Sequence, residues 1–267
     1  MSIHRNAPRL LILIHGAWQG SWAWEAVTPL LGQAGFETLA VDLPGNGRDG
    51  RSPSQITFTD YVQHVGTIID NHNGPVSLIG HSGGGMVASA VADRFPHQVD
   101  RIVYVAGMML PSDVPYISLL REVYGDEVAR VGIAPFLEFS KDGGTTSVSV
   151  EGARRIFYSD CGDELARALA ARLVPQPQLA RAATVSLTQE FTQVPRLYVE
   201  ALDDLSIPVE MQRLMQAKSP GAKCVSLPTG HAPQASRPDL LVQSILPFLQ
   251  QDIAQIGSHS PKLEVSA

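Results

Sequence analysis

The amino-acid sequence predicts an α/β fold: a mostly parallel sheet flanked by helices, with a helical cap inserted into it. Two observations carry this prediction. Short apolar runs alternate with amphipathic stretches along most of the chain, in the order expected of parallel strands joined by helices. A glycine-flanked serine, Ser82, stands between one apolar run and the helical stretch that follows it. A side chain in that position lies at the carboxyl end of a strand.

The first 106 residues contain four short apolar runs, separated from amphipathic stretches by Gly, Pro or Asp turns. Each run is short enough for a strand, and each stretch between runs has the spacing of a helix. The expected strands are 10–14, 36–41, 76–79 and 101–106, and the expected helices are 24–33, 59–71 and the segment after Ser82.

The alternation stops between residues 108 and 194. Helical periodicity is clear only at 162–173, no convincing buried strand occurs, and several prolines interrupt the segment. We interpret 108–194 as a helical cap inserted into one core made of 1–107 and 195–254. The core resumes with strands at 196–201 and 223–227 and helices at 209–218 and 238–249, and 255–267 is expected to be a mobile tail.

Composition excludes several classes of protein. A net charge of −6 without a Lys/Arg cluster argues against a nucleic-acid partner. No apolar stretch approaches the roughly 18 residues that cross a bilayer, so we expect a soluble, cytoplasmic protein with no membrane partner. Cys161 and Cys224 suit a reducing compartment, although their spacing leaves one disulfide open. A homodimer is possible.

The pentapeptide G-H-S-G-G, centred on Ser82, joins the strand at 76–79 to the following helix. Gly80 and Gly84 flank the serine because a Cβ at either position would collide with neighbouring backbone in so tight a turn. In this strand–turn–helix context the pattern indicates the nucleophile elbow of a serine hydrolase. No metal or cofactor is needed for such chemistry.

A serine hydroxyl needs a base within hydrogen-bond reach and an acid that orients the base. His231 lies in a Gly/Pro-flanked loop after the last expected strand, in the chain order Ser, Asp, His. Asp203 and Asp204 both follow the strand at 196–201, and only one of them can reach His231. The residues therefore predict a triad of Ser82, His231 and one of these aspartates.

Negative charge that develops on the substrate oxygen requires preorganised donors. The backbone N–H of Gly83 is one candidate, at the start of a helix whose positive dipole end favours an anion. The second is the N–H of Ala17, in the loop after the first strand. Together they form the predicted oxyanion hole.

With these residues in view, the span 10–249 resembles the α/β-hydrolase superfamily. The opening HGAWQGSWAW at 15–24 resembles the branch that holds plant methyl esterases, hydroxynitrile lyases and their bacterial carboxylesterase relatives. Lyases of this branch carry a threonine after the first histidine and a lysine after the catalytic histidine. Gly16 and Ala232 stand at these positions here, so the resemblance favours hydrolysis. Ser82 also speaks against members that use an aspartate nucleophile.

The segment PRLYVEALDD at 195–204, with VSLP at 225–228 and HAP at 231–233, is most similar to bacterial pyrethroid-hydrolysing carboxylesterases. In that family the acid lies six residues after the strand tyrosine. Counting from Tyr198, the resemblance implies that Asp204 is the acid of the triad.

The expected activity is that of a serine carboxylesterase acting on a small hydrophobic ester, aromatic or pyrethroid-like. A lactone or other acyl hydrolase, a small-molecule receptor with little turnover, and a hydroxynitrile lyase are the alternatives. The candidate substrate-lining residues, each of which could equally pack in the core, are Trp18, Trp22, Met108, Met109, Phe136, Phe139, Phe157, Tyr158 and Phe191.

Overall fold

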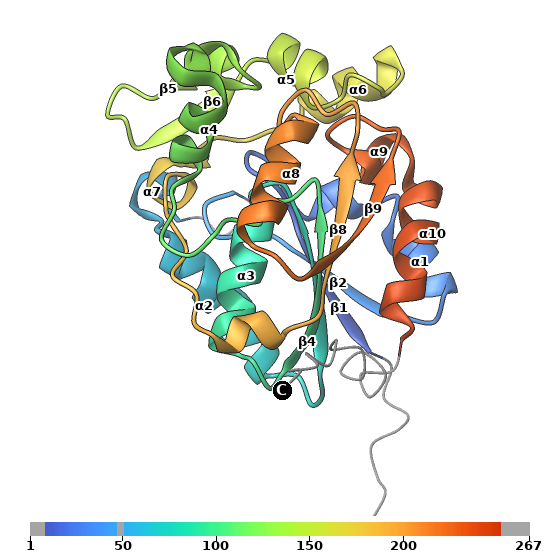
Figure 1. Ribbon diagram of the computed structural model, residues 1–267. Helices are drawn as coiled ribbons and strands as arrows, with labels where there is room; N and C mark the ends of the chain where they lie inside the picture. Colours follow the sequence, from blue (N-terminus) through green and yellow to red (C-terminus); the bar gives the residue numbers. More distant parts are fainter. Residues whose placement is uncertain (1–8, 47–50, 252–267) are drawn as a thin grey trace, which may run out of the picture.

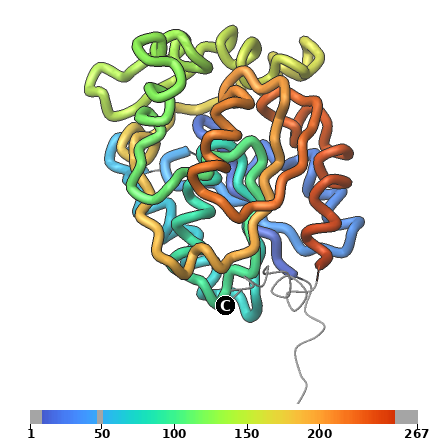
Figure 2. The backbone as a smooth tube through the Cα atoms, in the orientation of Figure 1, coloured from blue at the N-terminus to red at the C-terminus, as the bar shows by residue number. Residues whose placement is uncertain are grey.

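The computed structural model describes residues 9–46 and 51–251, so the expected mobile tail lies outside the described residues. Figure 1 shows a central sheet between two layers of helices, with a further group of helices and short strands over one end of the sheet. The tube in Figure 2 shows that this group, in green and yellow, comes from the middle of the chain. None of the described helices is both long and apolar enough to cross a membrane.

The main sheet has six parallel strands in the order β2-β1-β3-β4-β8-β9. The strands are β1 (Leu10–Ile14), β2 (Glu37–Val41), β3 (Val76–His81), β4 (Val99–Val105), β8 (Arg196–Ala201) and β9 (Ala222–Leu227). Strands β1, β3, β4 and β8 are buried along their whole length, as expected for parallel strands covered on both faces. All six expected strands are present.

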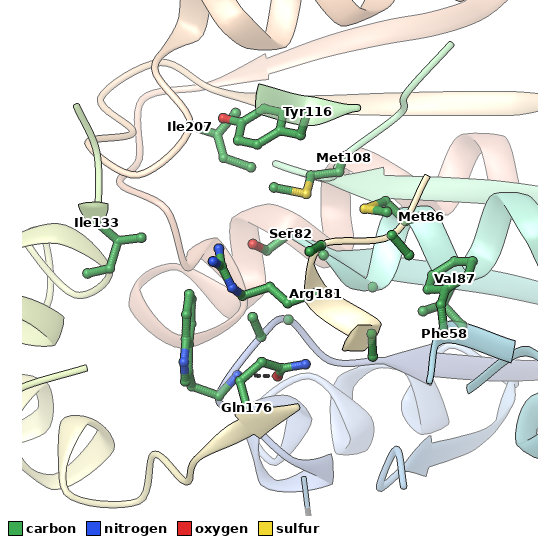
Figure 3. A pocket seen from close by; sticks show the side chains of 18 of the residues that line it. Phe58, Ser82, Met86, Val87, Met108, Tyr116, Ile133, Gln176, Arg181 and Ile207 are labelled. Atoms are coloured by element: carbon green, nitrogen blue, oxygen red, sulfur yellow. Dashed lines mark hydrogen bonds between the residues drawn. The ribbon is translucent and has the colours of Figure 1, made fainter. Parts of the chain in front are cut away.

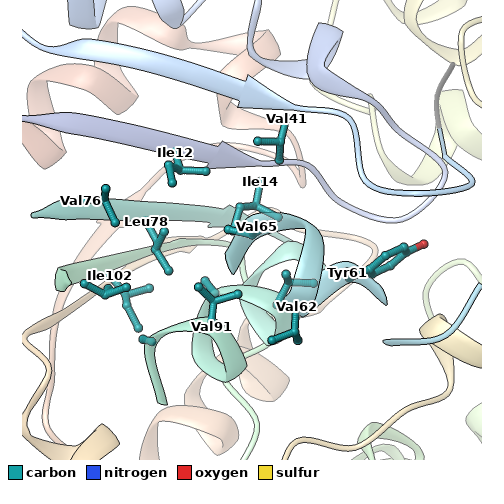
Figure 4. Packing of buried hydrophobic residues seen from close by; sticks show 14 of the residues in the cluster. Ile12, Ile14, Val41, Tyr61, Val62, Val65, Val76, Leu78, Val91 and Ile102 are labelled. Atoms are coloured by element: carbon teal, nitrogen blue, oxygen red, sulfur yellow. The ribbon is translucent and has the colours of Figure 1, made fainter. Parts of the chain in front are cut away.

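Helices cover both faces because successive strand side chains point to opposite sides. Ile12, Ile14 and Leu78 face α2 (Phe58–Asp70) and α3 (Gly84–Arg94), and this packing is drawn in Figure 4. On the opposite face, Leu11, Leu13, Ile79 and Val103 pack with α1 (Thr28–Gln33) and α10 (Pro238–Leu249). The remaining core helices are α8 (Val209–Lys218) and α9 (Pro233–Ser236).

The expected helix at 24–33 is split in the structure. A 3-10 turn occupies Ser21–Trp24, and α1 starts only at Thr28, with a proline in its first turn. Pro29 has no N–H and fixed φ, so it suits the start of a helix and opposes its continuation from an earlier turn. By contrast, α2 starts one residue before the expected position because Thr57 and Asp60 form a capping box.

The inserted segment contains a small sheet that the sequence did not indicate. Three antiparallel strands, in the order β5-β6-β7, accompany the helices of this segment. Its elements are α4 (Tyr116–Tyr124), β5 (Leu137–Phe139), β6 (Thr145–Val148), α5 (Val150–Ile156), α6 (Asp163–Ala170), β7 (Gln176–Pro177) and α7 (Gln178–Arg181). The inserted segment therefore contains helices, as expected, together with a small sheet that the expectation did not include. The strands were missed because none is longer than four residues.

Five 3-10 turns lie within the described residues, at Ser21–Trp24, Pro53–Gln55, Gly125–Arg130, Ala134–Phe136 and Glu190–Gln193. The last of these lies within the expected cap but packs beside α3, and its Phe191 belongs to the core of the main sheet. Both Cys161 and Cys224 are free thiols, so the disulfide that their spacing left open is not formed.

Candidate active site

Ser82 stands between the end of β3 and the start of α3, in a left-handed backbone conformation with φ of 50°. Hydrogen bonds hold this strained residue on both sides: its N–H donates to the Val105 carbonyl at 3.2 Å, and its carbonyl accepts from the Met108 N–H at 2.8 Å. A Cβ at Gly84 would lie 2.5 Å from the Ile14 carbonyl oxygen. The tight turn therefore requires glycine at this position, as the sequence indicates.

A chain of hydrogen bonds joins Asp204, His231 and Ser82. Oδ2 of Asp204 lies 2.7 Å from Nδ1 of His231, and Nε2 of His231 lies 3.1 Å from Oγ of Ser82. A carboxylate only accepts, so the histidine proton is on Nδ1 and the lone pair of Nε2 faces the serine hydroxyl. This is the tautomer that a general base requires.

The two adjacent aspartates differ in where their side chains lie. Asp204 is buried, and its Oδ1 accepts from the N–H groups of Ser206 at 2.7 Å and Ile207 at 2.9 Å. Asp203 is exposed: its backbone N–H donates to the Thr229 carbonyl at 3.0 Å, and its side chain forms no hydrogen bond with the described residues. Of the two, the structure brings Asp204 to the histidine.

The N–H groups of Ala17 and Gly83 lie on facing loops beside Ser82. A Cβ built at Gly83 would lie 3.7 Å from the Ala17 nitrogen, so the two loops approach closely. Within 9–46 and 51–251, neither N–H donates a hydrogen bond to another protein group. Gly83 is also the N-cap of α3, whose dipole favours negative charge there. Two backbone donors without a protein acceptor in the described residues thus lie close together beside Ser82.

His81, the variable residue of the elbow, supports the loop that carries His231. Its Nε2 lies 2.9 Å from the His231 carbonyl, and the two rings lie 4.8 Å apart. Burial, reinforced by the neighbouring His231, lowers the pKa of His81 well below its usual value. His81 therefore stays neutral, and it does not oppose a positive charge forming on His231.

His15 fastens the loop that presents Ala17. Its Nδ1 lies 2.7 Å from the Gly16 carbonyl, and its Nε2 accepts from the Leu43 N–H at 3.0 Å. Because the carbonyl can only accept and the amide can only donate, this histidine is neutral with its proton on Nδ1. Burial lowers its pKa from 6.5 to about 4.

The low pKa of His15 predicts acid sensitivity. Above pH 6.5 the side chain is neutral in both states, but between pH 6.5 and 4 only the unfolded chain binds the proton. The free energy of unfolding should therefore fall by about 3 kcal/mol over that window from this residue alone. NMR titration of the His15 ring checks this prediction, since a midpoint near 6.5 instead of about 4 would contradict it.

Gln176, on β7 of the inserted segment, also anchors the loop that presents Ala17. Its Oε1 accepts from the Trp18 N–H at 2.9 Å and from Asn46, and its Nε2 donates to the Tyr61 hydroxyl at 2.9 Å. Trp18 adopts φ of 62°, a conformation that a bulky residue rarely takes without such support. Gln176 thus fixes the backbone next to the Ala17 N–H.

Replacing Gln176 with leucine should lower kcat about tenfold and the stability by about 2 kcal/mol, because buried donors lose their acceptor and Trp18 can relax. The effect should fall on kcat more than on KM. Ester hydrolysis and chemical denaturation measure both quantities. The matched control is Gln193→Leu, because Gln193 is exposed. It should change neither kcat nor stability. Equal effects of the two substitutions would refute the role of Gln176 in positioning the loop.

A cavity of about 360 Å³ opens at Ser82. Its walls are mostly apolar, and Figure 3 shows side chains from the core and from the inserted segment around it. Besides the loop residues 15–18 and 82–84, the cavity is lined by Phe58, Tyr61, Met86, Val87, Met108, Tyr116, Ile133, Leu137, Gln176, Arg181 and Ile207, among others.

Of the nine candidate lining residues, the structure places Trp18 and Met108 in the cavity wall and the other seven elsewhere. Phe157 packs on Trp18 and on the His231 ring at 5.4 Å, outside the cavity lining. Tyr158 accepts from Gln19 at 3.2 Å. The rest pack in the core or face the surface: Met109 and Phe191 are core residues, Phe136 and Trp22 lie under Arg155 and Arg172, and Phe139 is 60% exposed.

Sequence reasoning also missed several residues of the cavity wall. Met86 and Val87 lie on the first turn of α3 and Ile207 follows Asp204 by three residues, so their proximity to the triad could have indicated them. Nothing in the sequence pointed to Arg181 or Gln176, because they lie on elements of the inserted segment whose direction toward Ser82 is set only by the fold.

The alpha/beta hydrolase family model matches residues 11–244, most of the chain. The chain belongs to the alpha/beta hydrolase family. A pyrethroid hydrolase from Sphingobium wenxiniae is 32% identical over 250 residues, covering 89% of this chain and 86% of that protein. Methylesterase 7 of Arabidopsis thaliana is 30% identical, with 91% of this chain and 96% of that protein covered.

Among solved structures of this fold, a pyrethroid hydrolase from Sphingobium faniae superposes with a TM-score of 0.80. The two sequences are 29% identical, and the match covers 91% of this chain and 97% of that one. The resemblance drawn from the sequence motifs, and the alpha/beta hydrolase fold that it implied, are confirmed.

Proposed function

We propose that this alpha/beta hydrolase is a serine carboxylesterase that cleaves hydrophobic carboxylic esters through Ser82, His231 and Asp204. One observation carries the proposal: the unbroken hydrogen-bond chain from Asp204 to Ser82 ends beside two unused N–H donors, at the wall of a mostly apolar cavity. Similarity to a pyrethroid hydrolase and to a methylesterase supports ester hydrolysis.

In the first half of the reaction, Oγ of Ser82 attacks the ester carbonyl carbon while Nε2 of His231 takes the hydroxyl proton. The carbonyl π electrons move onto oxygen, and the N–H groups of Ala17 and Gly83 stabilise that oxyanion, each worth about 3 kcal/mol in such sites. When the tetrahedral intermediate collapses, the C–O bond to the alcohol breaks. The protonated His231 donates its proton to the departing alkoxide, leaving an acyl-serine.

The second half repeats these steps with water as the nucleophile. Nε2 of His231 takes a proton from water, and the hydroxide attacks the acyl carbon. Collapse of the second intermediate breaks the bond to Oγ of Ser82, which regains its proton from His231 and releases the carboxylic acid. Asp204 keeps its charge throughout and stabilises the imidazolium that forms twice.

The cavity volume of about 360 Å³ and its mostly apolar walls support a hydrophobic substrate of moderate size. Met108, Phe58 and Ile133 offer apolar contacts on three sides, as Figure 3 shows. A pyrethroid-like or aromatic ester fits these features.

Steady-state hydrolysis of p-nitrophenyl esters of increasing acyl length, beside one pyrethroid, tests the proposal. Multiple turnover would support an esterase, and the chain-length profile would report the size of the acyl site. A stable adduct at Ser82 after a single turnover, detected by intact mass, would point instead to a receptor. Preference for a lactone panel, or cyanide release from mandelonitrile, would point to the other acyl hydrolases or to a lyase.

A further inference from the structure

Arg181, at the end of α7, lines the same cavity as Ser82. Figure 3 shows its side chain extending into the cavity among Ser82, Ile133 and Gln176. Its Nε donates to Oε1 of Gln178 at 3.1 Å, and the guanidinium lies 5.9 Å from the centre of the Trp18 ring. These two contacts hold the guanidinium across the cavity wall.

The charge of Arg181 has no counter-charge in the described part of the chain. No carboxylate there forms an ion pair with it, and its two terminal nitrogens donate to no protein group. Three other cap arginines, Arg154, Arg167 and Arg172, are paired with carboxylates, whereas Arg155, which has no carboxylate partner among the described residues, is exposed to solvent and does not line the cavity. Partial burial lowers the pKa of Arg181, yet an arginine stays protonated in proteins. A partly desolvated cation without a counter-charge is costly, so its presence requires a reason.

A ligand carboxylate would supply that reason. The free face of a guanidinium presents a planar fork of N–H donors that matches a carboxylate in a bidentate geometry. Because Arg181 and Ser82 line one cavity, a single substrate can reach both: its ester carbonyl at Ser82 and an anionic group at Arg181.

We propose that Arg181 selects esters that carry a carboxylate besides the ester bond, such as half-esters of dicarboxylic acids. This inference rests on the proposed esterase function and refines its substrate class. It adds one anion-binding position to a cavity that is otherwise mostly apolar, and it makes Arg181 a specificity-determining residue.

The test compares substrates that differ only in their terminal charge. Mono-p-nitrophenyl adipate and suberate are each paired with the ester of the matching terminal amide, and spontaneous hydrolysis is subtracted. The measured quantity is the ratio of kcat/KM for the carboxylate to kcat/KM for the amide within one protein, so a general loss of activity cancels. We expect a ratio of roughly ten or more in the wild type for at least one chain length, as for hydrogen bonds to charged groups.

In Arg181→Met the ratio should fall to about one, and Arg181→Lys should give an intermediate value because it keeps the charge but loses the fork. Arg155→Met is the matched control, since Arg155 is an exposed cap arginine that stacks on Phe136 at 5.6 Å. It should keep the wild-type ratio. A wild-type ratio near one at both chain lengths, or a ratio that survives in Arg181→Met, would overturn the inference. Equal losses on both substrates in Arg181→Met would indicate a role toward the oxyanion instead and would also overturn it.

A binding measurement separates failure of this inference from failure of the proposed function. In the Ser82→Ala background, tryptophan fluorescence titrations with the same ester pairs require no turnover. Binding of the carboxylate about tenfold tighter than the amide, abolished in Ser82→Ala/Arg181→Met, would support the anion site even if the wild type hydrolyses no ester. Equal binding of carboxylate and amide would refute it, whatever the wild type hydrolyses.

Discussion

Replacing Ser82 with alanine is expected to lower kcat for ester hydrolysis by about 10⁴-fold or more. The substitution removes the only oxygen that His231 can deprotonate in the hydrogen-bond chain, so no acyl-enzyme can form. Binding should persist, because the cavity walls and the N–H groups of Ala17 and Gly83 are untouched. The result is read from kcat with a p-nitrophenyl ester and from mass spectra, which should lose the acyl adduct.

Stability should hardly change in Ser82→Ala. The alanine keeps the Cβ and the backbone bonds to Val105 and Met108, and the side chain loses only its contact with His231. Ser89→Ala is the matched control on α3, the helix that follows Ser82, since the Ser89 hydroxyl forms a hydrogen bond with the Tyr104 hydroxyl at 2.8 Å within the core. It should lose about 1 kcal/mol of stability while retaining turnover. Turnover near the wild-type rate in Ser82→Ala would mean that another group is the nucleophile.

The main sheet could be predicted from the sequence because its strands are short, largely apolar runs separated by clear turn residues. β1, α8 and α10 have the expected boundaries, since the pattern there is determined by residues close in sequence. The inserted segment was harder. Its strands gain their hydrogen bonds from partners in neighbouring short segments, such as β6 between β5 and β7, and two to four residues carry no periodicity of their own.

The position of Ser82 in the candidate site was predictable for a similar reason, and the residues of the cavity wall were not. The elbow around Ser82 is fixed by local backbone crowding, which leaves a glycine signature in the sequence. Whether a residue lines the cavity depends instead on the direction in which its side chain points from its helix or strand. Phe139 and Leu137 share one short strand, yet Leu137 lines the cavity while Phe139 is largely exposed. Hydrophobicity alone cannot separate two such residues.

Exchanging Asp204 for asparagine should lower kcat by about 10³- to 10⁴-fold with little change in fold. Two backbone N–H donors determine the orientation of the asparagine amide. The N–H groups of Ser206 and Ile207 point at the Oδ1 position, so the amide oxygen must occupy that side. The amide NH₂ then faces Nδ1 of His231, which must become the acceptor.

This orientation moves the histidine proton to Nε2, where it confronts the Ser82 hydroxyl as a donor and cannot act as a base. Asp203→Asn provides the control at the adjacent position: its side chain is exposed, so its kcat/KM should stay within about twofold of the wild type. Both variants are compared by ester hydrolysis at the same pH, with circular dichroism for the fold. Equal losses of kcat/KM in the two variants, or a greater loss in Asp203→Asn, would mean that Asp204 does not orient His231. Only the carboxylate that faces Nδ1 can set the tautomer of the histidine.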